Sequence, residues 1–219
     1  MKTPSNLAAY FDHTNLKADT GEKDIKKLCE EAIENRFYSV CVNPVWVKNC
    51  AKWTKGSDVK VCTVIGFPLG ANKTAIKQSE IKRAISDGAH EVDLVINIGK
   101  LRDGKIRYVR DELTKARKTA GNAVLKVIIE TCYLNETEKE AAIKLCVETG
   151  CDFVKTSTGF GSGGATVDDI RLMRKIGGNK IKIKASGGIK TLQSVLGLIE
   201  AGADRIGSSG SVTILKENK

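Results

Sequence analysis

Apolar and polar residues recur along the chain in two patterns. Short runs rich in β-branched residues are typical of buried strands, and the segments between them carry apolar residues every three or four positions, as helices do. The runs predict about eight strands, spaced roughly every 20–35 residues, at 9–12, 37–42, 59–65, 91–96, 124–129, 152–155, 180–184 and 204–207. The first is a short candidate.

The segments between these runs have the pattern of amphipathic helices. The clearest are 104–121, 135–150, 166–177 and 191–202. Gly121 is expected to end the first of them, because glycine readily takes the backbone conformation at a helix end. Asn135 and Glu138 have the spacing of a capping box, which predicts a helix start at this point.

Strand and helix follow each other without interruption, which indicates parallel strands joined by right-handed crossovers. About eight such units favour a closed barrel. We therefore expect an α/β fold, a single (β/α)8 TIM barrel, that forms one domain over residues 1–219. The alternative is an open doubly wound sheet, which would follow if 9–12 were not a strand.

Length and composition agree with this fold and leave the partner open. The chain has 219 residues, a common length for α/β barrels, and no apolar run long enough to span a membrane. The first residues carry no long apolar stretch, so we expect no secretory signal. The formal net charge of +10 allows a nucleic acid, an acidic membrane surface or a small anionic substrate as partner.

Cysteine and histidine usage argues against disulfides and metal sites. The seven cysteines include no Cys-x-x-Cys pair, and the two histidines, His13 and His90, lie far apart. We therefore expect reduced thiols, a cytoplasmic protein and no bound metal. Cys41 lies near a strand end and is expected to be a buried structural thiol, with an aldehyde-reactive thiol as the alternative.

Two loops of small residues follow the last two predicted strands, at 185–188 and 207–210. In barrel enzymes the active site lies at the carboxyl ends of the strands, and phosphate sites often follow the seventh and eighth. Backbone N–H groups in such loops can bind a phosphate. Together the loops predict a phosphate site.

Lys155 and Lys184 are expected at the ends of neighbouring strands, which lie about 5 Å apart. Two ammonium groups at that distance repel by roughly 3 kcal/mol at an effective dielectric constant near 20. This corresponds to about two pKa units, enough to make one lysine a nucleophile that forms a Schiff base with a carbonyl. On this ground Lys155 and Lys184 are both candidates for the nucleophile.

Asp93 is the third candidate for chemistry. Its neighbours Val92, Leu94 and Val95 are apolar, so a carboxylate among them needs a partner. Lysines in the barrel mouth would supply one. A carboxylate beside an imine can also shuttle protons, which aldol chemistry requires.

With these residues in hand, the chain resembles the deoxyribose-phosphate aldolases of the shorter bacterial and archaeal type. The most specific stretches are Lys-Thr-Ser-Thr-Gly from Lys155 and Lys-Ala-Ser-Gly-Gly from Lys184. The matching stretches extend over nearly the whole chain, at 12–14, 39–44, 64–70, 91–93, 95–99, 126–131, 153–160 and 182–189.

The resemblance implies roles for individual residues. Lys155 matches the Schiff-base lysine, Lys184 the second lysine that lowers its pKa, and Asp93 the carboxylate of the proton relay. Phosphate or substrate binding is implied for Gly159, Gly187, Gly188, Gly207 and Ser209, and supporting roles for Asp12, Thr14 and Thr158. Three residues depart from the family's usual pattern: Asn15, Ser162 and Gly210.

The resemblance further implies reversible cleavage of 2-deoxy-D-ribose 5-phosphate to D-glyceraldehyde 3-phosphate and acetaldehyde, in deoxyribonucleoside catabolism. It implies no cofactor, a small phosphorylated sugar as partner, and a homo-oligomer, either a dimer or a tetramer. Another Schiff-base phosphosugar aldolase or a transaldolase is the alternative. A nucleic-acid binder is disfavoured, because basic residues are spread along the chain and aromatic residues make up only 5%.

Overall fold

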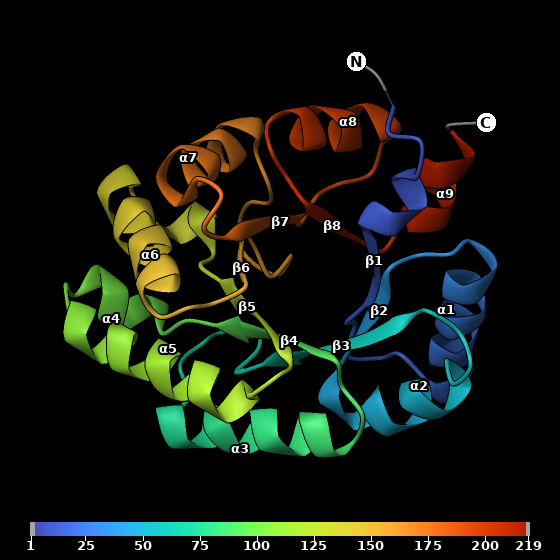
Figure 1. Cartoon of the computed structure of the whole chain (residues 1–219), viewed down its shortest axis with the longest axis horizontal. Helices are drawn as coiled ribbons and strands as arrows, with labels where there is room; N and C mark the ends of the chain where they lie inside the picture. Colours follow the sequence, from blue (N-terminus) through green and yellow to red (C-terminus); the bar gives the residue numbers. More distant parts are fainter. Residues whose placement is uncertain (1–2, 218–219) are drawn as a thin grey trace.

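The fold is a closed barrel of eight parallel strands, seen in a computed structural model that describes residues 3–217 (Figure 1). The strands are β1 (Phe11–Asn15), β2 (Ser39–Val42), β3 (Lys60–Ile65), β4 (Glu91–Val95), β5 (Val124–Ile128), β6 (Phe153–Lys155), β7 (Lys182–Ser186) and β8 (Arg205–Ser208). Each strand pairs with the next, and β1 pairs with β8, so the sheet has no open edge. The predicted TIM barrel is confirmed, and the open sheet is excluded.

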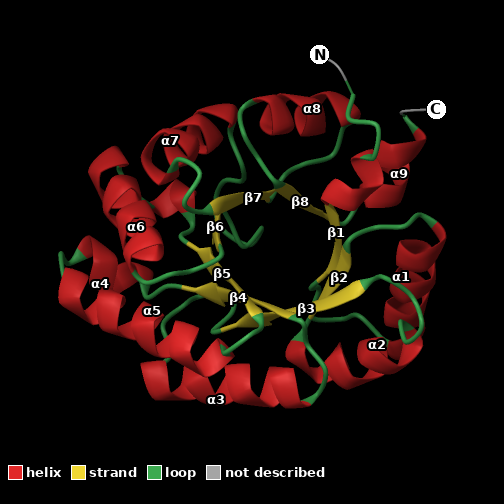
Figure 2. Cartoon of the chain, in the orientation of Figure 1, coloured by secondary structure: helices red, strands yellow, loops and turns green. Residues whose placement is uncertain are grey.

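Helices surround the barrel as an outer ring (Figure 2). They are α1 (Glu22–Glu34), α2 (Val47–Trp53), α3 (Thr74–Ser86), α4 (Ile98–Arg102), α5 (Ile106–Ala120), α6 (Glu136–Glu148), α7 (Val167–Gly177), α8 (Leu192–Glu200) and α9 (Ser211–Lys216). Three short 3-10 helices are η1 (Leu7–Tyr10), η2 (Pro44–Trp46) and η3 (Thr131–Tyr133). Along residues 3–217 we find no helix that is both long and apolar enough to cross a membrane.

The first strand lies further along the chain than its predicted position, 9–12. The apolar residues at 7–10 form η1, and β1 begins at Phe11 and continues through polar side chains to Asn15. Those polar residues hide the strand pattern, because several of them face other polar groups inside the barrel. Asp12 is therefore the second residue of its strand rather than the last.

Other local predictions agree with the structure. The side chain of Asn135 accepts a hydrogen bond from the N–H of Glu138, and the carboxylate of Glu138 accepts one from the N–H of Asn135, which completes the capping box of α6. Gly121 follows the last residue of α5 with a positive φ of 56°. These signals define where the helices begin and end, so they set the lengths of the loops around the barrel.

Alternate residues of each strand face opposite sides of the barrel wall. In β4, Val92 and Leu94 belong to the apolar core, which also contains side chains from the surrounding helices. Glu91 and Asp93 occupy the alternate positions and are also fully buried. The interior of the barrel therefore holds charged side chains, whereas the layer between strands and helices is apolar.

Candidate active site

Every strand contributes a polar side chain to one buried cluster inside the barrel. Register pairing sets Asp93 beside Lys126, and Lys155 beside Lys184, on adjacent strands. The ionisable side chains of this cluster, in strand order, are those of Asp12, Cys41, Cys62, Glu91, Asp93, Lys126, Lys155, Lys184 and Arg205. Because isolated charges are costly to bury, these groups must compensate one another.

Asp93 lies at the centre of this cluster. Its Oδ2 atom accepts hydrogen bonds from Nζ of Lys155 at 2.7 Å and from Nζ of Lys184 at 2.8 Å. Its Oδ1 atom accepts one from Nζ of Lys126 at 2.8 Å and one from the thiol of Cys62 at 3.2 Å. Burial alone would raise the pKa of Asp93, but the three ammonium groups hold that pKa well below its usual range.

Lys184 is fully buried and forms ion pairs with Asp12 and, at 2.8 Å, with Asp93. Burial would lower the pKa of Lys184, but the two carboxylates raise that pKa above its ordinary value. The repulsion expected from a neighbouring lysine is therefore outweighed at Lys184, and this side chain stays an ammonium ion. The sequence could not show this, because the position of the Asp12 side chain depends on where β1 begins.

The buried cluster holds more cationic side chains than carboxylates. Within residues 3–217, ion pairs of 4 Å or less connect three carboxylates with four cationic side chains, Lys126, Lys155, Lys184 and Arg205. Three of these cations neutralise the three carboxylates. A buried cluster with no net charge is the least costly, so it favours one lysine as the neutral amine.

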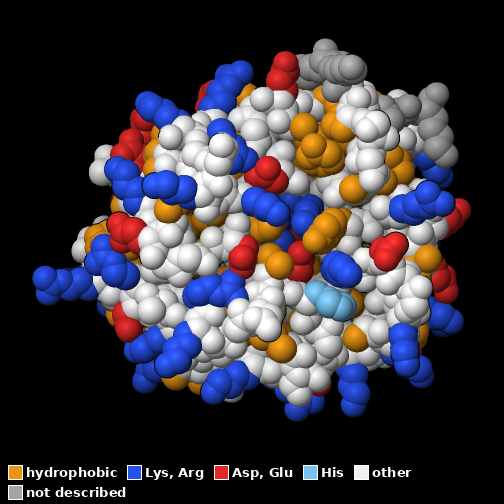
Figure 3. Space-filling view, viewed as in Figure 1, with side chains coloured by type: hydrophobic (Ala, Val, Ile, Leu, Met, Phe, Trp, Pro, Cys, Tyr) orange, Lys and Arg blue, Asp and Glu red, His pale blue; other side chains and the backbone are white. Residues whose placement is uncertain are grey.

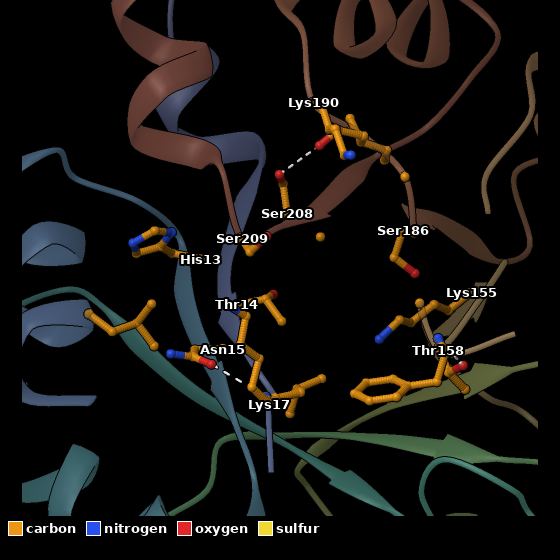
Figure 4. A pocket seen from close by; sticks show the side chains of 18 of the residues that line it. His13, Thr14, Asn15, Lys17, Lys155, Thr158, Ser186, Lys190, Ser208 and Ser209 are labelled. Carbon is orange, nitrogen blue, oxygen red and sulfur yellow. Dashed lines mark hydrogen bonds between the residues drawn. The ribbon is translucent and has the colours of Figure 1, made fainter. Parts of the chain in front are cut away.

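A pocket of about 530 Å³ opens at the carboxyl ends of the strands, and Lys155 lines it. Figure 4 shows the Lys155 side chain reaching into this pocket from one wall, across from Thr14. Lys184 and Asp93 are fully buried in the barrel interior. Of the three lysines that contact Asp93, Lys155 is therefore the one that lines the pocket.

The residues predicted to bind phosphate or substrate gather around the same pocket. Its lining includes the predicted Gly159, Gly187, Gly188, Gly207 and Ser209, together with Thr14 and Thr158. Three lysines without a predicted role, Lys17, Lys27 and Lys190, also line it. Cations at the wall of a pocket favour an anionic ligand.

Glycine leaves room for close contacts at two positions beside the pocket, one just after β7 and one in β8. Gly187 has a φ of +87°, and a Cβ atom there would lie 3.1 Å from Cα of Gly164. At Gly207 a Cβ atom would lie 3.1 Å from Cε of Lys184. Strand β8 thus approaches the buried Lys184 closely because its residue Gly207 carries no side chain.

The three residues with implied supporting roles, Asp12, Thr14 and Thr158, have different hydrogen-bond and ion-pair partners. Asp12 forms an ion pair with Lys184. The Thr14 hydroxyl instead donates to the backbone carbonyl of Asp12 at 2.8 Å. Thr158 donates its hydroxyl and its backbone N–H to the carboxylate of Glu130, a buried residue with a φ of +52°. Glu130 therefore holds the loop after β6 in position.

Gly210 and Asn15, which depart from the family pattern, and Cys41 each have defined local contacts. The N–H of Gly210 donates to Oγ of Ser208 at 3.0 Å, just before α9. Asn15 accepts hydrogen bonds through its side-chain oxygen from Thr20 and Lys17. Cys41 is fully buried and packs with Cys62, Leu16 and Val64.

Four buried charged residues at the site were not predicted: Glu91, Lys126, Arg205 and Glu130. Lys126 carried a usable signal, since it is a charged residue in the apolar run 124–129 with the same alternation as the strand interior. Glu91 and Arg205 begin their strands, where polar residues are common, so the sequence alone does not distinguish them.

Within residues 3–217, two groups of buried side chains have the composition of metal ligands, Cys41 with Cys62 and Asp93, and Asp12 with Cys62 and Glu91. In each group the ligating atoms lie within 4.8 Å of one another. The carboxylates are already bound by lysine and arginine nitrogens. Since these cations surround both groups, the cluster is organised for ammonium groups rather than for a metal ion.

Comparison with known proteins agrees with this geometry. A family model described as DeoC/LacD family aldolase matches residues 6–216. A protein of Thermococcus kodakarensis named deoxyribose-phosphate aldolase is 55% identical over 214 residues, which cover 96% of each chain. The solved structure "QR15, an Aldolase" has a TM-score of 0.94 and 43% identity, covering 98% of this chain and 96% of that one.

A more distant structure, described as a unique tetrameric structure of deoxyribose phosphate aldolase from Aeropyrum pernix, has a TM-score of 0.90 at 29% identity. It covers 96% of this chain and 90% of that one. Fold, site geometry and sequence similarity over nearly the full length thus lead to one conclusion: the chain belongs to the DeoC/LacD family of aldolases.

Proposed function

We propose that this protein cleaves 2-deoxy-D-ribose 5-phosphate reversibly to D-glyceraldehyde 3-phosphate and acetaldehyde through a Schiff base on Lys155. One observation carries the proposal: Lys155 lines the pocket and contacts Asp93 Oδ2 at 2.7 Å, whereas Lys184 is buried and held as an ammonium ion. The names of close relatives support this substrate.

In the first step the Lys155 amine attacks the C1 aldehyde of the open-chain sugar. Loss of water gives a protonated imine, which withdraws electrons from the neighbouring carbon. The C3 hydroxyl then loses its proton while the C2–C3 bond breaks and its electron pair moves toward the imine. Glyceraldehyde 3-phosphate, carrying C3 to C5, leaves, and C1 and C2 remain on Lys155 as an enamine.

Asp93 and Lys184 are assigned the proton transfers. Asp93 Oδ2 lies within hydrogen-bonding distance of both lysine nitrogens, so it can accept a proton at one moment and return it at another. Lys184 supplies a nearby ammonium ion. Protonation of the enamine at C2 regenerates an imine, and water then releases acetaldehyde and frees Lys155.

The phosphate is assigned to the loops after β7 and β8. Glycine and serine residues at 187–188 and 207–209 line the pocket, with the cationic side chain of Lys190 beside them. Binding the phosphate far from the reacting bond holds C1 near the Lys155 amine, which uses binding energy for orientation. The chemistry uses side chains of the protein alone and calls for no cofactor.

The cellular setting follows as part of the same proposal. We place the enzyme in the cytoplasm, where its substrate would arise from deoxyribonucleosides and its seven thiols would stay reduced. A homo-oligomer, a dimer or a tetramer, is supported by the tetrameric relative. On the face seen in Figure 3, Lys and Arg side chains are interspersed with Asp and Glu, which does not suit a nucleic-acid surface.

Substrate comparison tests the proposal against another Schiff-base phosphosugar aldolase or a transaldolase. Cleavage rates should be measured with deoxyribose 5-phosphate and with fructose 1-phosphate, fructose 6-phosphate and fructose 1,6-bisphosphate. We expect cleavage of deoxyribose 5-phosphate with release of acetaldehyde. Faster cleavage of a fructose phosphate would reject deoxyribose 5-phosphate as the substrate. The protein would then be another Schiff-base phosphosugar aldolase or a transaldolase.

A further inference from the structure

The two oxygens of the Asp93 carboxylate have separate sets of partners. Oδ2 faces Lys155 and Lys184, the residues assigned to the chemistry. Oδ1 faces the other way, toward Nζ of Lys126 at 2.8 Å and the thiol of Cys62 at 3.2 Å. A carboxylate held at both oxygens cannot rotate about its side-chain bond without breaking hydrogen bonds.

Lys126 is held as firmly as the carboxylate. Its side chain is completely buried in β5, and its Nζ lies 2.6 Å from a Glu91 oxygen and 3.3 Å from Sγ of Cys62. Burial alone would lower the pKa of Lys126, but the nearby carboxylates, Asp93 foremost, raise that pKa well above its ordinary value. Lys126 therefore remains a cation with a defined direction toward Asp93.

The geometry points to Lys126 as a positioning residue that fixes Asp93 by its Oδ1 atom and so leaves Oδ2 free to exchange protons with Lys155 and the substrate. This inference rests on the proposed function and extends it to a residue that never touches the substrate. Lys126 lies on the far side of the carboxylate from Lys155.

Removing Lys126 is expected to affect proton transfer more than imine formation. Imine formation requires the Lys155 amine in the pocket. Interconversion of imine and enamine requires a base in line with the methyl carbon derived from acetaldehyde, and a rotated Asp93 would lose that alignment. Catalytic groups misplaced by about 1 Å can cost on the order of 100-fold in rate.

The two steps can be measured separately with acetaldehyde alone. Borohydride trapping reports the imine on Lys155. Exchange of the acetaldehyde methyl hydrogens for deuterium in D2O reports the imine–enamine proton transfer. For Lys126→Met we expect trapping within about threefold of the original protein and deuterium exchange slowed by at least tenfold.

A matched control comes from a second buried lysine. Lys77 is almost fully buried, forms an ion pair with Glu112 at 2.9 Å, and donates to the carbonyl of Val95. Lys77→Met removes a buried cation of the same kind outside the cluster. We expect it to lower stability while trapping and exchange in the folded protein change in parallel, by less than threefold.

The double variant Lys126→Met with Glu91→Gln keeps the test valid if the single variant unfolds. It removes one charge of each sign, so the buried cluster stays balanced, but Oδ1 of Asp93 still lacks its ammonium partner. We expect this variant to fold and to remain at least tenfold slow in deuterium exchange.

The pH profile of exchange adds a readout that a purely structural role would not change. The charged and titratable groups facing Asp93 from all strands are Asp12, Cys41, Cys62, Glu91, Lys126, Lys155, Lys184 and Arg205. Removing one fixed cation from this set should move the midpoint of the exchange profile to higher pH. An unchanged pH profile would contradict a positioning role for Lys126.

The outcomes separate the two proposals. If the original protein neither traps acetaldehyde nor exchanges its hydrogens, the proposed function is wrong. If the original protein does both, and the Lys126 variants slow trapping and exchange equally or leave both unchanged, Lys126 has no positioning role and the proposed function stands.

Discussion

Asp93 and Lys155 meet through a hydrogen bond of 2.7 Å between Oδ2 and Nζ inside the barrel. This contact couples the amine that faces the pocket to a carboxylate that solvent does not reach. A proton leaving the amine or a bound intermediate therefore has an acceptor at hydrogen-bonding distance.

Replacing the carboxylate by an amide tests the proton relay. Asp93→Asn keeps the shape of the side chain but removes its charge, so it should lower kcat by roughly 100- to 10,000-fold. It also leaves buried lysines without their anion, which typically costs about 3–5 kcal/mol of unfolding free energy. Kinetics and urea unfolding measure the two effects. A kcat within threefold of the original would remove Asp93 from the mechanism.

Lys184→Leu tests the second lysine. Asp12 keeps its ion pair with Arg205 at 2.7 Å, so we expect the barrel to fold. Activity should fall at least 100-fold, because the ammonium ion beside Asp93 is lost. Lys182→Leu is the control, since Lys182 lies two positions earlier on β7 and is exposed. Full activity in the Lys184 variant, measured by acetaldehyde release, would contradict the relay.

Lys190→Met tests the anion site. This side chain lines the pocket beside the glycine loop, so its loss should weaken phosphate binding. We expect KM for deoxyribose 5-phosphate to rise about tenfold, with kcat nearly unchanged. Unphosphorylated 2-deoxyribose serves as the control substrate, because its kcat/KM should not change. Equal losses with both substrates would indicate a structural role instead.

The buried cations predict a pH dependence of stability. The pKa of Lys126 is raised on folding, so its contribution should be complete below the unfolded pKa of about 10.4 and be lost as pH rises toward the folded value. Urea unfolding of the original protein and Lys126→Met between pH 8 and 11.5 measures this contribution as a difference. The difference should shrink above about pH 10.4. A constant or growing difference would show that the cation is not stabilised as described.

The barrel itself could be predicted because each strand and helix carries its own local pattern. The error at β1 has a physical cause: Asp12, His13 and Thr14 are polar but lie in a strand. Asp12 is compensated by Lys184 and Arg205, which are distant in sequence, so no local pattern reveals that it is buried.

The candidate site was predictable where a charged residue stands in an apolar run or beside a glycine loop. Lys155, Lys184 and Asp93 have such surroundings, and the structure brings them together. Lys126 has the same signal but no loop after it that suggests a ligand. The protonation state of Lys184 could not be predicted, because its pKa depends on the carboxylates of Asp12 on β1 and Asp93 on β4.

Trapping the covalent intermediate tests the central claim most directly. The protein should be incubated with acetaldehyde and borohydride, digested, and the modified residue located by mass spectrometry. We predict a reduced two-carbon adduct on Lys155. The adduct should be absent from Lys155→Leu, and neither protein should carry it when borohydride is left out. An adduct on Lys184 or any other lysine, with Lys155 unmodified, would contradict the assignment.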